Sequence, residues 1–171
     1  MSASEPRLVF VIGGARSGKS RFAETLIETH APPWIYVATA QAFDDEMADR
    51  IAIHQGRRDA RWSTSDAPHE LAAQIAATPK DPMLVDCLTL WLSNRLLADA
   101  PLEAEGDALV LALKARTAPT VVVANEVGLG LVPETSLGRA FRDAAGRLNQ
   151  KVAAAADAVH FVAAGLPMRM K

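Results

Sequence analysis

The tightest constraint on this chain is a glycine-rich run that follows its first apolar segment. Residues 8–12 read LVFVI, and the next eight are Gly13, Gly14, Ala15, Arg16, Ser17, Gly18, Lys19 and Ser20. The spacing G-x-x-x-x-G-K-S between a strand and a helix predicts a loop whose backbone N–H groups point at phosphate oxygens. A helix beginning at Lys19 adds partial positive charge there. In such loops the lysine reaches the β- and γ-phosphates, and the serine hydroxyl coordinates Mg²⁺.

Apolar runs without polar alternation recur along the chain. They lie at 8–12, 34–38, 83–85, 120–124 and 158–163. Such runs are typical of strands in a parallel sheet that is covered on both faces. Helical segments are predicted between and after them, at 19–29, 44–56, 68–77, 88–97, 103–116 and 136–157. The alternation predicts an α/β fold of three layers, a mostly parallel sheet flanked by helices.

Length and composition fit one domain of this class. The chain has 171 residues, a net charge of -2 and a single cysteine, Cys87. A chain of this length buries roughly 70% of its unfolded surface and needs no disulfide or structural metal. The lone cysteine cannot form an internal bridge, so we expect a reducing, cytoplasmic setting. Without a long apolar run or an excess of basic residues, we expect neither a membrane span nor a nucleic-acid partner.

Asp86 is the second candidate for metal binding. It directly follows the apolar run 83–85. Phosphate-loop enzymes commonly hold Mg²⁺ with an acidic residue at the end of a buried strand. We predict that Asp86 binds Mg²⁺, partly through water, and that its strand lies next to the first strand. The alternative is an ordinary polar residue that ends a strand.

His54 is the candidate for covalent chemistry. Glu46, Arg50 and His54 recur every four residues and share one face of the predicted helix 44–56. Spacing alone leaves open whether this is a solvated ion-pair stripe or a reactive site.

The chain lacks the Asn-Lys-x-Asp and Asp-x-x-Gly segments of signalling GTPases. Phosphoryl-transfer chemistry is therefore favoured over a switch. The loop 125–134 fits either a binding loop or a plain connection.

These motifs resemble one family almost end to end, the bifunctional adenosylcobinamide kinase/adenosylcobinamide-phosphate guanylyltransferases of cobalamin biosynthesis. Beyond the phosphate loop with Arg21, the matching segments are Tyr36-Val37-Ala38-Thr39-Ala40, Asp45-Glu46-Met47, Arg50-Ile51, His54, Trp62, Thr64, Asn125-Glu126-Val127-Gly128, Val132-Pro133-Glu134, Phe141-Arg142-Asp143, Gly146-Arg147, Asn149-Gln150 and Ala156-Asp157. The resemblance implies a single kinase and guanylyltransferase domain over residues 1–171, with a RecA-like phosphate-loop fold.

The resemblance also implies two reactions. In the first, ATP or GTP phosphorylates the aminopropanol hydroxyl of adenosylcobinamide. In the second, GTP loses pyrophosphate, and its GMP is carried on His54 to the phosphorylated corrinoid, which becomes adenosylcobinamide-GDP. An imidazole suits this role because it is largely neutral near pH 7 and nucleophilic. Lys19 and Mg²⁺ would offset the charge on the departing pyrophosphate.

Further nucleotide contacts follow from the same resemblance. Besides the loop 13–20, they are Thr39, Ala40, Gln41, Gln55, Gly56, Arg57, Arg58, Asp66 and Asp86. Relatives can carry Glu at the two Asp positions, so these arms are one carbon shorter here. The resemblance further implies a homo-oligomer, a trimer. Two alternatives stay open: a single-function phosphate-loop kinase in which His54 ends a helix, and a nucleotide-regulated binding module without turnover.

Overall fold

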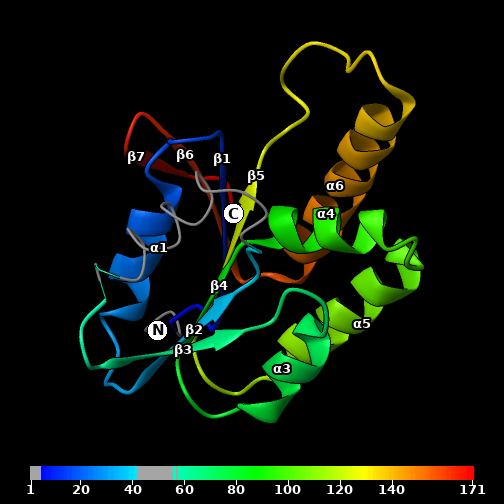
Figure 1. Cartoon of the computed structure of the whole chain (residues 1–171). Helices are drawn as coiled ribbons and strands as arrows, with labels where there is room; N and C mark the ends of the chain where they lie inside the picture. The colour runs from blue at the N-terminus through cyan, green and yellow to red at the C-terminus, as the bar shows by residue number, and fades with distance from the viewer. Residues whose placement is uncertain (1–4, 42–55, 57) are drawn as a thin grey trace.

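The computed structural model describes residues 5–41, 56 and 58–171 (Figure 1). That part of the chain forms a seven-stranded sheet in the order β3-β2-β4-β5-β1-β6-β7. The strands are β1 (Leu8–Gly13), β2 (Trp34–Ala38), β3 (Trp62–Asp66), β4 (Met83–Asp86), β5 (Thr120–Asn125), β6 (Ala158–Ala163) and β7 (Leu166–Arg169). The helices are α1 (Lys19–Ile27), α3 (Leu71–Ala77), α4 (Leu88–Leu97), α5 (Leu102–Ala115) and α6 (Ser136–Ala155). All strand pairs are parallel except β6–β7.

Helices cover both faces of this sheet, as Figure 1 shows. On one face, Ala23 and Ile27 of α1 belong to an apolar cluster with side chains of β1 and β2. These are Val9, Val11, Trp34 and Tyr36. On the other face α3, α4, α5 and α6 contribute the larger apolar cluster, in which Trp91 is 2% exposed. The predicted fold class is therefore confirmed. None of the helices in the described ranges is long and apolar enough to cross a bilayer.

The five predicted strands are confirmed, but the order of two of them differs from the prediction. We expected the strand ending in Asp86 to lie beside the first strand. That expectation is wrong, because β5 lies between β4 and β1 and pairs with both. A continuous apolar run shows that a strand is buried but does not specify its neighbours. Order within the sheet is set by how the helices pack.

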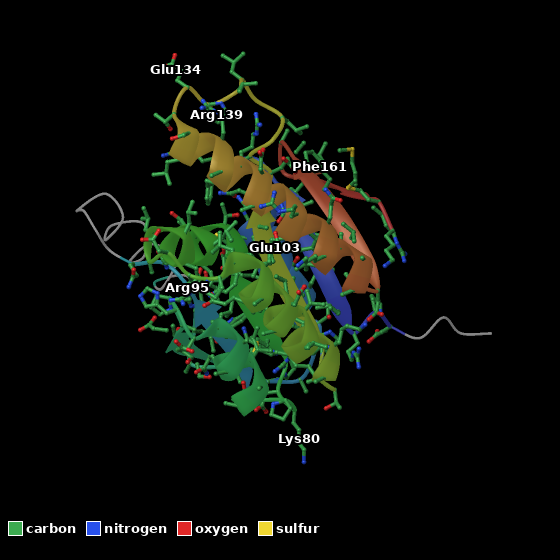
Figure 2. The ribbon with its side chains drawn as sticks, turned by 90° about the vertical axis from the view of Figure 1, so that its right-hand side faces the viewer. Lys80, Arg95, Glu103, Glu134, Arg139 and Phe161 are labelled. Atoms are coloured by element: carbon green, nitrogen blue, oxygen red, sulfur yellow. The ribbon has the colours of Figure 1, made fainter. Side chains whose placement is uncertain are left out.

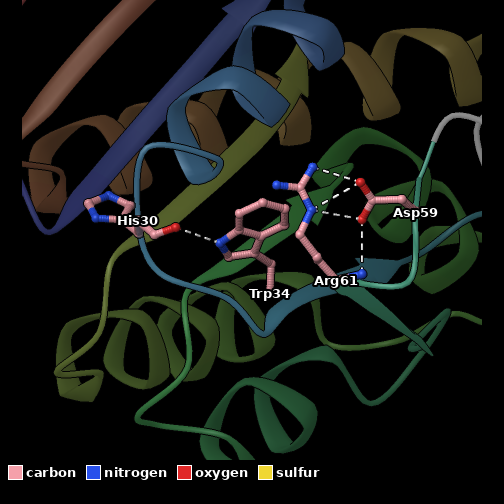
Figure 3. Close-up of polar contacts among 4 residues, drawn as sticks. All are labelled: His30, Trp34, Asp59 and Arg61. Atoms are coloured by element: carbon pink, nitrogen blue, oxygen red, sulfur yellow. Dashed lines mark hydrogen bonds and ion pairs between the residues drawn. The ribbon is translucent and has the colours of Figure 1, made fainter.

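Two strands were missed by the sequence analysis, and the first is β3. Its sequence WSTSD has one apolar residue, and most of its side chains are exposed at the edge of the sheet. The Trp62 ring lies 5.2 Å from the Trp34 ring, which anchors β3 on β2. Just before β3, Arg61 bonds Asp59 and stacks on Trp34, whose indole N–H donates to the His30 carbonyl (Figure 3). Aromatic packing rather than alternation therefore forms this strand.

The second missed strand is β7, which returns from β6 through a two-residue turn. Both turn residues have positive φ, 51° at Ala164 and 79° at Gly165. Such turns match the right-handed twist of a hairpin. The Gly165 N–H then donates to the Ser17 carbonyl at 2.8 Å. The hairpin turn is therefore in direct contact with the glycine-rich loop.

Helix boundaries differ from the predictions by up to three residues. The helix predicted from 68 begins at Leu71, because Pro68 and His69 have carbonyls that accept from Asn94 and the Trp91 indole, at 3.1 Å and 2.9 Å. The helix predicted to 157 ends at Ala155, because the Asp157 carboxylate accepts instead from the backbone N–H groups that start β1. The helix predicted at 44–56 lies outside the described residues except for Gly56.

A buried arginine, Arg116, links segments at the amino ends of β4 and β5, away from the glycine-rich loop. Arg116 is 1% exposed, and its guanidinium donates to the Thr120 hydroxyl and to the carbonyls of Ile75, Thr78 and Asp81. Burial lowers its pKa to about 10. One side chain thus satisfies polar groups from α3, from the segment before β4 and from β5. The sequence carries no signal for this role.

We expect Arg116→Met to lower the free energy of unfolding by about 3 kcal/mol, because it leaves several buried carbonyls without a donor. Urea denaturation measures this change. Lys114→Met, two residues earlier on the exposed side of α5, is the control and should stay within about 0.5 kcal/mol of the parent. Equal effects of the two variants would contradict the assigned role of Arg116.

Candidate nucleotide-binding site

The glycine-rich loop connects the carboxyl end of β1 to α1, as the motif predicts. The Gly14 carbonyl accepts from the Ser17 N–H at 3.3 Å and from Lys19 Nζ at 3.1 Å. Arg16 and Gly18 both have positive φ, 55° and 92°. Lys19 is 9% exposed, so its ammonium is held against the loop. A curled backbone with an enclosed lysine at a helix N-terminus is suited to bind a phosphate chain.

Gly13 is the position where the loop cannot accept a side chain. A Cβ there would lie 2.3 Å from the Val162 carbonyl oxygen of β6 and 2.8 Å from Ser17 Oγ. At Gly18, which has positive φ, a Cβ would also lie 3.1 Å from the Gly165 Cα. At Gly14 a Cβ would meet nothing within 4 Å. The glycines at the two ends of the motif are therefore required by the β6–β7 hairpin.

Asp66 and Asp86 lie at the same level of the sheet, on either side of β2. Both are in register with Ala38, from β3 and β4 respectively. Residues in register point to the same face, here the face that carries α1.

Burial raises the pKa of the Cys87 thiol to about 12, and the positive charge of Lys19 counteracts part of this rise. The helix α1, which begins with Lys19, packs against β4.

These residues fit a bound Mg²⁺ of the kind that nucleotide enzymes use. Within the described ranges, no three His, Cys, Asp or Glu side chains gather to hold a metal ion alone. Mg²⁺ usually keeps several waters and takes only one or two carboxylates together with phosphate oxygens. Asp86, with Ser20 in the first turn of α1, supplies that smaller set.

Tyr36 joins Asp86 to Arg58, and sequence analysis assigned it no role. The Tyr36 hydroxyl donates to Asp86 Oδ2 at 3.0 Å. Burial and the neighbouring Asp86 charge raise the pKa of Tyr36 well above its ordinary value. The Arg58 guanidinium carbon lies 3.6 Å from the centre of the Tyr36 ring. Only the position of a tyrosine within a buried strand could have drawn attention to it.

Thr39 serves the fold rather than an open site. It is 0% exposed, and its hydroxyl donates to the Cys87 carbonyl at 2.7 Å and accepts from the Cys87 N–H at 2.9 Å. Its carbonyl accepts from Asn94. The predicted contacts Ala40 and Gln41 are half-buried, and Gln41 Nε2 lies 3.2 Å from His69 Nε2.

Three predicted residues, His54, Gln55 and Arg57, lie outside the described residues. Gly56 between them is exposed. The structure places the loop 13–20, Asp66 and Asp86 at the carboxyl ends of parallel strands, but three strands lie between the strand of Asp66 and that of the loop. The role of His54 as the nucleophile therefore stays a prediction.

The segment after β5 begins at the phosphate loop and then leaves the body of the molecule. Its Glu126 N–H donates to the Gly13 carbonyl at 3.1 Å, and Glu126 Oε1 accepts from the Gly128 N–H at 2.6 Å. The segment then extends away from the sheet and returns at α6, where Arg139 donates to the carbonyls of Pro133 and Glu134 (Figures 1 and 2). Leu131, near its tip, is 96% exposed.

Fold and loop together define a phosphate-loop nucleotide-binding protein. A solved structure of a prototypical ATPase from the type III secretion system of pathogenic bacteria aligns with a TM-score of 0.51 and 11% identity. The alignment covers 95% of this chain and 56% of the ATPase chain. At that identity the likeness concerns the fold alone.

The particular family follows from sequence comparison. The family model described as cobinamide kinase / cobinamide phosphate guanyltransferase matches residues 9–170, and the chain belongs to this family. The bifunctional adenosylcobalamin biosynthesis protein CobP of Pseudomonas aeruginosa is 47% identical, over 94% of this chain and 95% of that protein. The protein of the same description named CobU in Salmonella typhimurium is 42% identical, over 96% and 99%.

We expect Gly13→Ala to weaken nucleotide binding roughly tenfold or more, a loss of about 1.4 kcal/mol, because the new Cβ forces the loop away from β6. Gly14→Ala is the matched control and should bind within about twofold of the parent, since its Cβ meets open space. Fluorescence titration with N-methylanthraniloyl-GTP (mant-GTP) measures both. A Gly14→Ala defect as large as that of Gly13→Ala would contradict the packing argument.

Proposed function

We propose that residues 1–171 form one nucleotide-binding domain that catalyses both reactions of its family. The first is ATP- or GTP-dependent phosphorylation of adenosylcobinamide, and the second is transfer of GMP from GTP to the product, giving adenosylcobinamide-GDP. The observation that carries the proposal is the enclosed Lys19, bonded to the Gly14 carbonyl in a curled loop that opens into α1, the helix packed against the strand of Asp86. Positioned charges at such an edge stabilise phosphoryl transfer.

In the kinase reaction the loop amides and Lys19 bind the triphosphate, and the corrinoid hydroxyl attacks the γ-phosphorus. The O–P bond to the β-phosphate breaks as the new O–P bond forms, and the hydroxyl loses its proton. Ser20 and Asp86 would hold Mg²⁺, which when bound neutralises charge on the phosphate oxygens. Lys19 also offsets charge that develops on the departing diphosphate.

In the guanylyltransferase reaction His54 is the nucleophile. A neutral ring nitrogen forms a bond to the α-phosphorus of GTP and pyrophosphate leaves. An oxygen of the corrinoid phosphate then attacks the same phosphorus, and the P–N bond breaks to regenerate the imidazole. Support for this assignment comes from the family resemblance and from Arg58, four residues after His54, which stacks on Tyr36 beside Asp86.

The remaining assigned contacts surround the same edge. Thr39, Ala40 and Gln41 follow β2, and Asp66 ends β3. We assign the nucleotide to this edge and the corrinoid to the space beyond it. The Thr39 contribution is through neighbouring backbone, because its own hydroxyl is already bonded to Cys87. A cytoplasmic location stays a prediction.

We also propose that the protein is a homotrimer. Large apolar side chains in the segment after β5 are exposed in the single chain, with Leu129 at 79% and Leu131 at 96%. Contiguous apolar surface of this kind commonly marks contacts between protein chains.

We expect GTP labelled at its α-phosphate to leave an acid-labile label on the protein, and His54→Asn to abolish it. Corrinoid phosphorylation should persist in His54→Asn within about tenfold, because the kinase step does not use the ring. His30→Asn is the control, since His30 precedes the amino end of β2, whereas the loop follows the carboxyl end of the parallel strand β1; Figure 3 shows His30 beside Trp34. If His54→Asn still becomes labelled and transfers GMP, His54 is not the nucleophile.

Sedimentation equilibrium tests the assembly. We expect a mass of three chains at micromolar concentration, because burial of the exposed leucines favours association. A mass of one chain across the concentration range would contradict the trimer.

A further inference from the structure

Tyr36 is a buried polar residue that neither reaction step uses. It is 4% exposed, lies in the middle of β2 and belongs, with Leu84 of the neighbouring β4, to the apolar cluster beneath α1. A phenylalanine would fill that space as well, and it would bring no hydroxyl to desolvate. The hydroxyl is therefore expected to have a task. Its partner is Asp86 Oδ2, at 3.0 Å.

This hydrogen bond orients the Asp86 carboxylate. A carboxylate at the end of a strand can rotate about its terminal bond, and that rotation is broad. A donor on one oxygen selects one orientation and leaves Oδ1 for another ligand. Among the described residues, the Tyr36 hydroxyl is the only side-chain donor to Asp86. Since Tyr36 is held by the core, the direction of Oδ1 is set by the fold.

The ring of Tyr36 has a separate role, which is to support the side chain of Arg58. It carries the Arg58 guanidinium, whose carbon lies 3.6 Å from the ring centre. Arg58 Nη1 is buried and has no hydrogen-bond partner in the part of the chain that the structure describes. A buried donor without an acceptor is costly, so this N–H is poised for an acceptor that arrives with a ligand. A guanidinium held flat presents its donors in a fixed plane, which suits phosphate oxygens.

We propose that Tyr36 is a positioning residue of the nucleotide site, which aims Asp86 through its hydroxyl and Arg58 through its ring. The inference rests on the proposed function, because Asp86 and Arg58 are the contacts assigned there. It adds that one buried side chain sets the direction of both. An anionic ligand with a divalent cation would meet the carboxylate on one side of the tyrosine and the guanidinium on the other.

Two substitutions separate the two tasks. Tyr36→Phe keeps the ring and removes the hydroxyl, whereas Tyr36→Leu removes both. With mant-GTP as the probe, we expect Tyr36→Phe to raise the Mg²⁺ concentration for half-maximal tight binding roughly 3- to 10-fold, the effect of losing one hydrogen bond to a charged group. In EDTA, Tyr36→Phe should bind mant-GTP like the parent. Tyr36→Leu should bind it roughly 3- to 10-fold more weakly in EDTA, because Arg58 loses its platform.

Three further variants make each outcome decisive. Asp86→Asn should raise the Mg²⁺ requirement at least as much as Tyr36→Phe, and Arg58→Ala should reproduce the EDTA defect of Tyr36→Leu. Trp62→Phe alters the other ring that packs on Tyr36, 6.2 Å away, and should change neither titration. Thermal denaturation of every variant identifies effects that are due to stability alone.

The failures are distinguishable. A normal Mg²⁺ requirement in Asp86→Asn would overturn the metal role of Asp86 and with it that part of the proposed function. If Asp86→Asn changes the Mg²⁺ requirement and Tyr36→Phe does not, the proposed role of the Tyr36 hydroxyl is wrong, and the role of the ring is unaffected. Normal EDTA binding in Tyr36→Leu with a defect in Arg58→Ala would overturn the ring task alone. If Tyr36→Leu does not fold, Tyr36→Met, which fills more of the space but also lacks the ring, is titrated in EDTA instead, and binding like that of the parent would overturn the role of the ring.

Discussion

The close approach of the β6 backbone to the carboxyl end of β1 is the constraint on which the site depends. The Val162 carbonyl oxygen lies only 2.3 Å from the position that a Cβ of Gly13 would take, and the β6–β7 turn donates to the Ser17 carbonyl. The phosphate loop is therefore held from outside by a hairpin, not only by its own hydrogen bonds. Because the loop is fixed before a ligand binds, little conformational entropy remains to be lost on binding. Its curled backbone and enclosed lysine follow from that support.

Around this loop, three parallel strands bring chemical groups from distant parts of the sequence to one edge. Asp66, Asp86 and the segment after β2 lie at corresponding heights because the strands share a register. Parallel strands connected by crossovers place every carboxyl end on the same side, where α/β proteins bind ligands. The intervening β5 separates the loop from Asp86 by one strand, and Tyr36 approaches Asp86 from β2, on the other side of β4. Membership of the cobinamide kinase / cobinamide phosphate guanyltransferase family accounts for a site of this composition.

Not all charged residues near this edge face a ligand. Arg139 is bonded to the carbonyls of Pro133 and Glu134, and Arg142 pairs with Asp143 at 3.0 Å. Arg139 holds the start of α6, where Figure 2 labels it, and Arg142 is paired within the same helix. Arg58 differs from them because one of its donors has no acceptor among the described residues. Burial without a partner, rather than charge, distinguishes the two kinds of arginine.

The sequence by itself determined the phosphate loop, the five buried strands and the family, because these depend on residue types at fixed local spacings. It did not reveal β3 or β7, since a polar edge strand and a short hairpin return have no continuous apolar run. The roles of Tyr36, Thr39 and Arg116 were decided only by tertiary structure. Each depends on a partner far away in sequence, such as Asp86 fifty residues after Tyr36. Which groups meet across strands follows from the order and register of the whole sheet, and no local spacing encodes them.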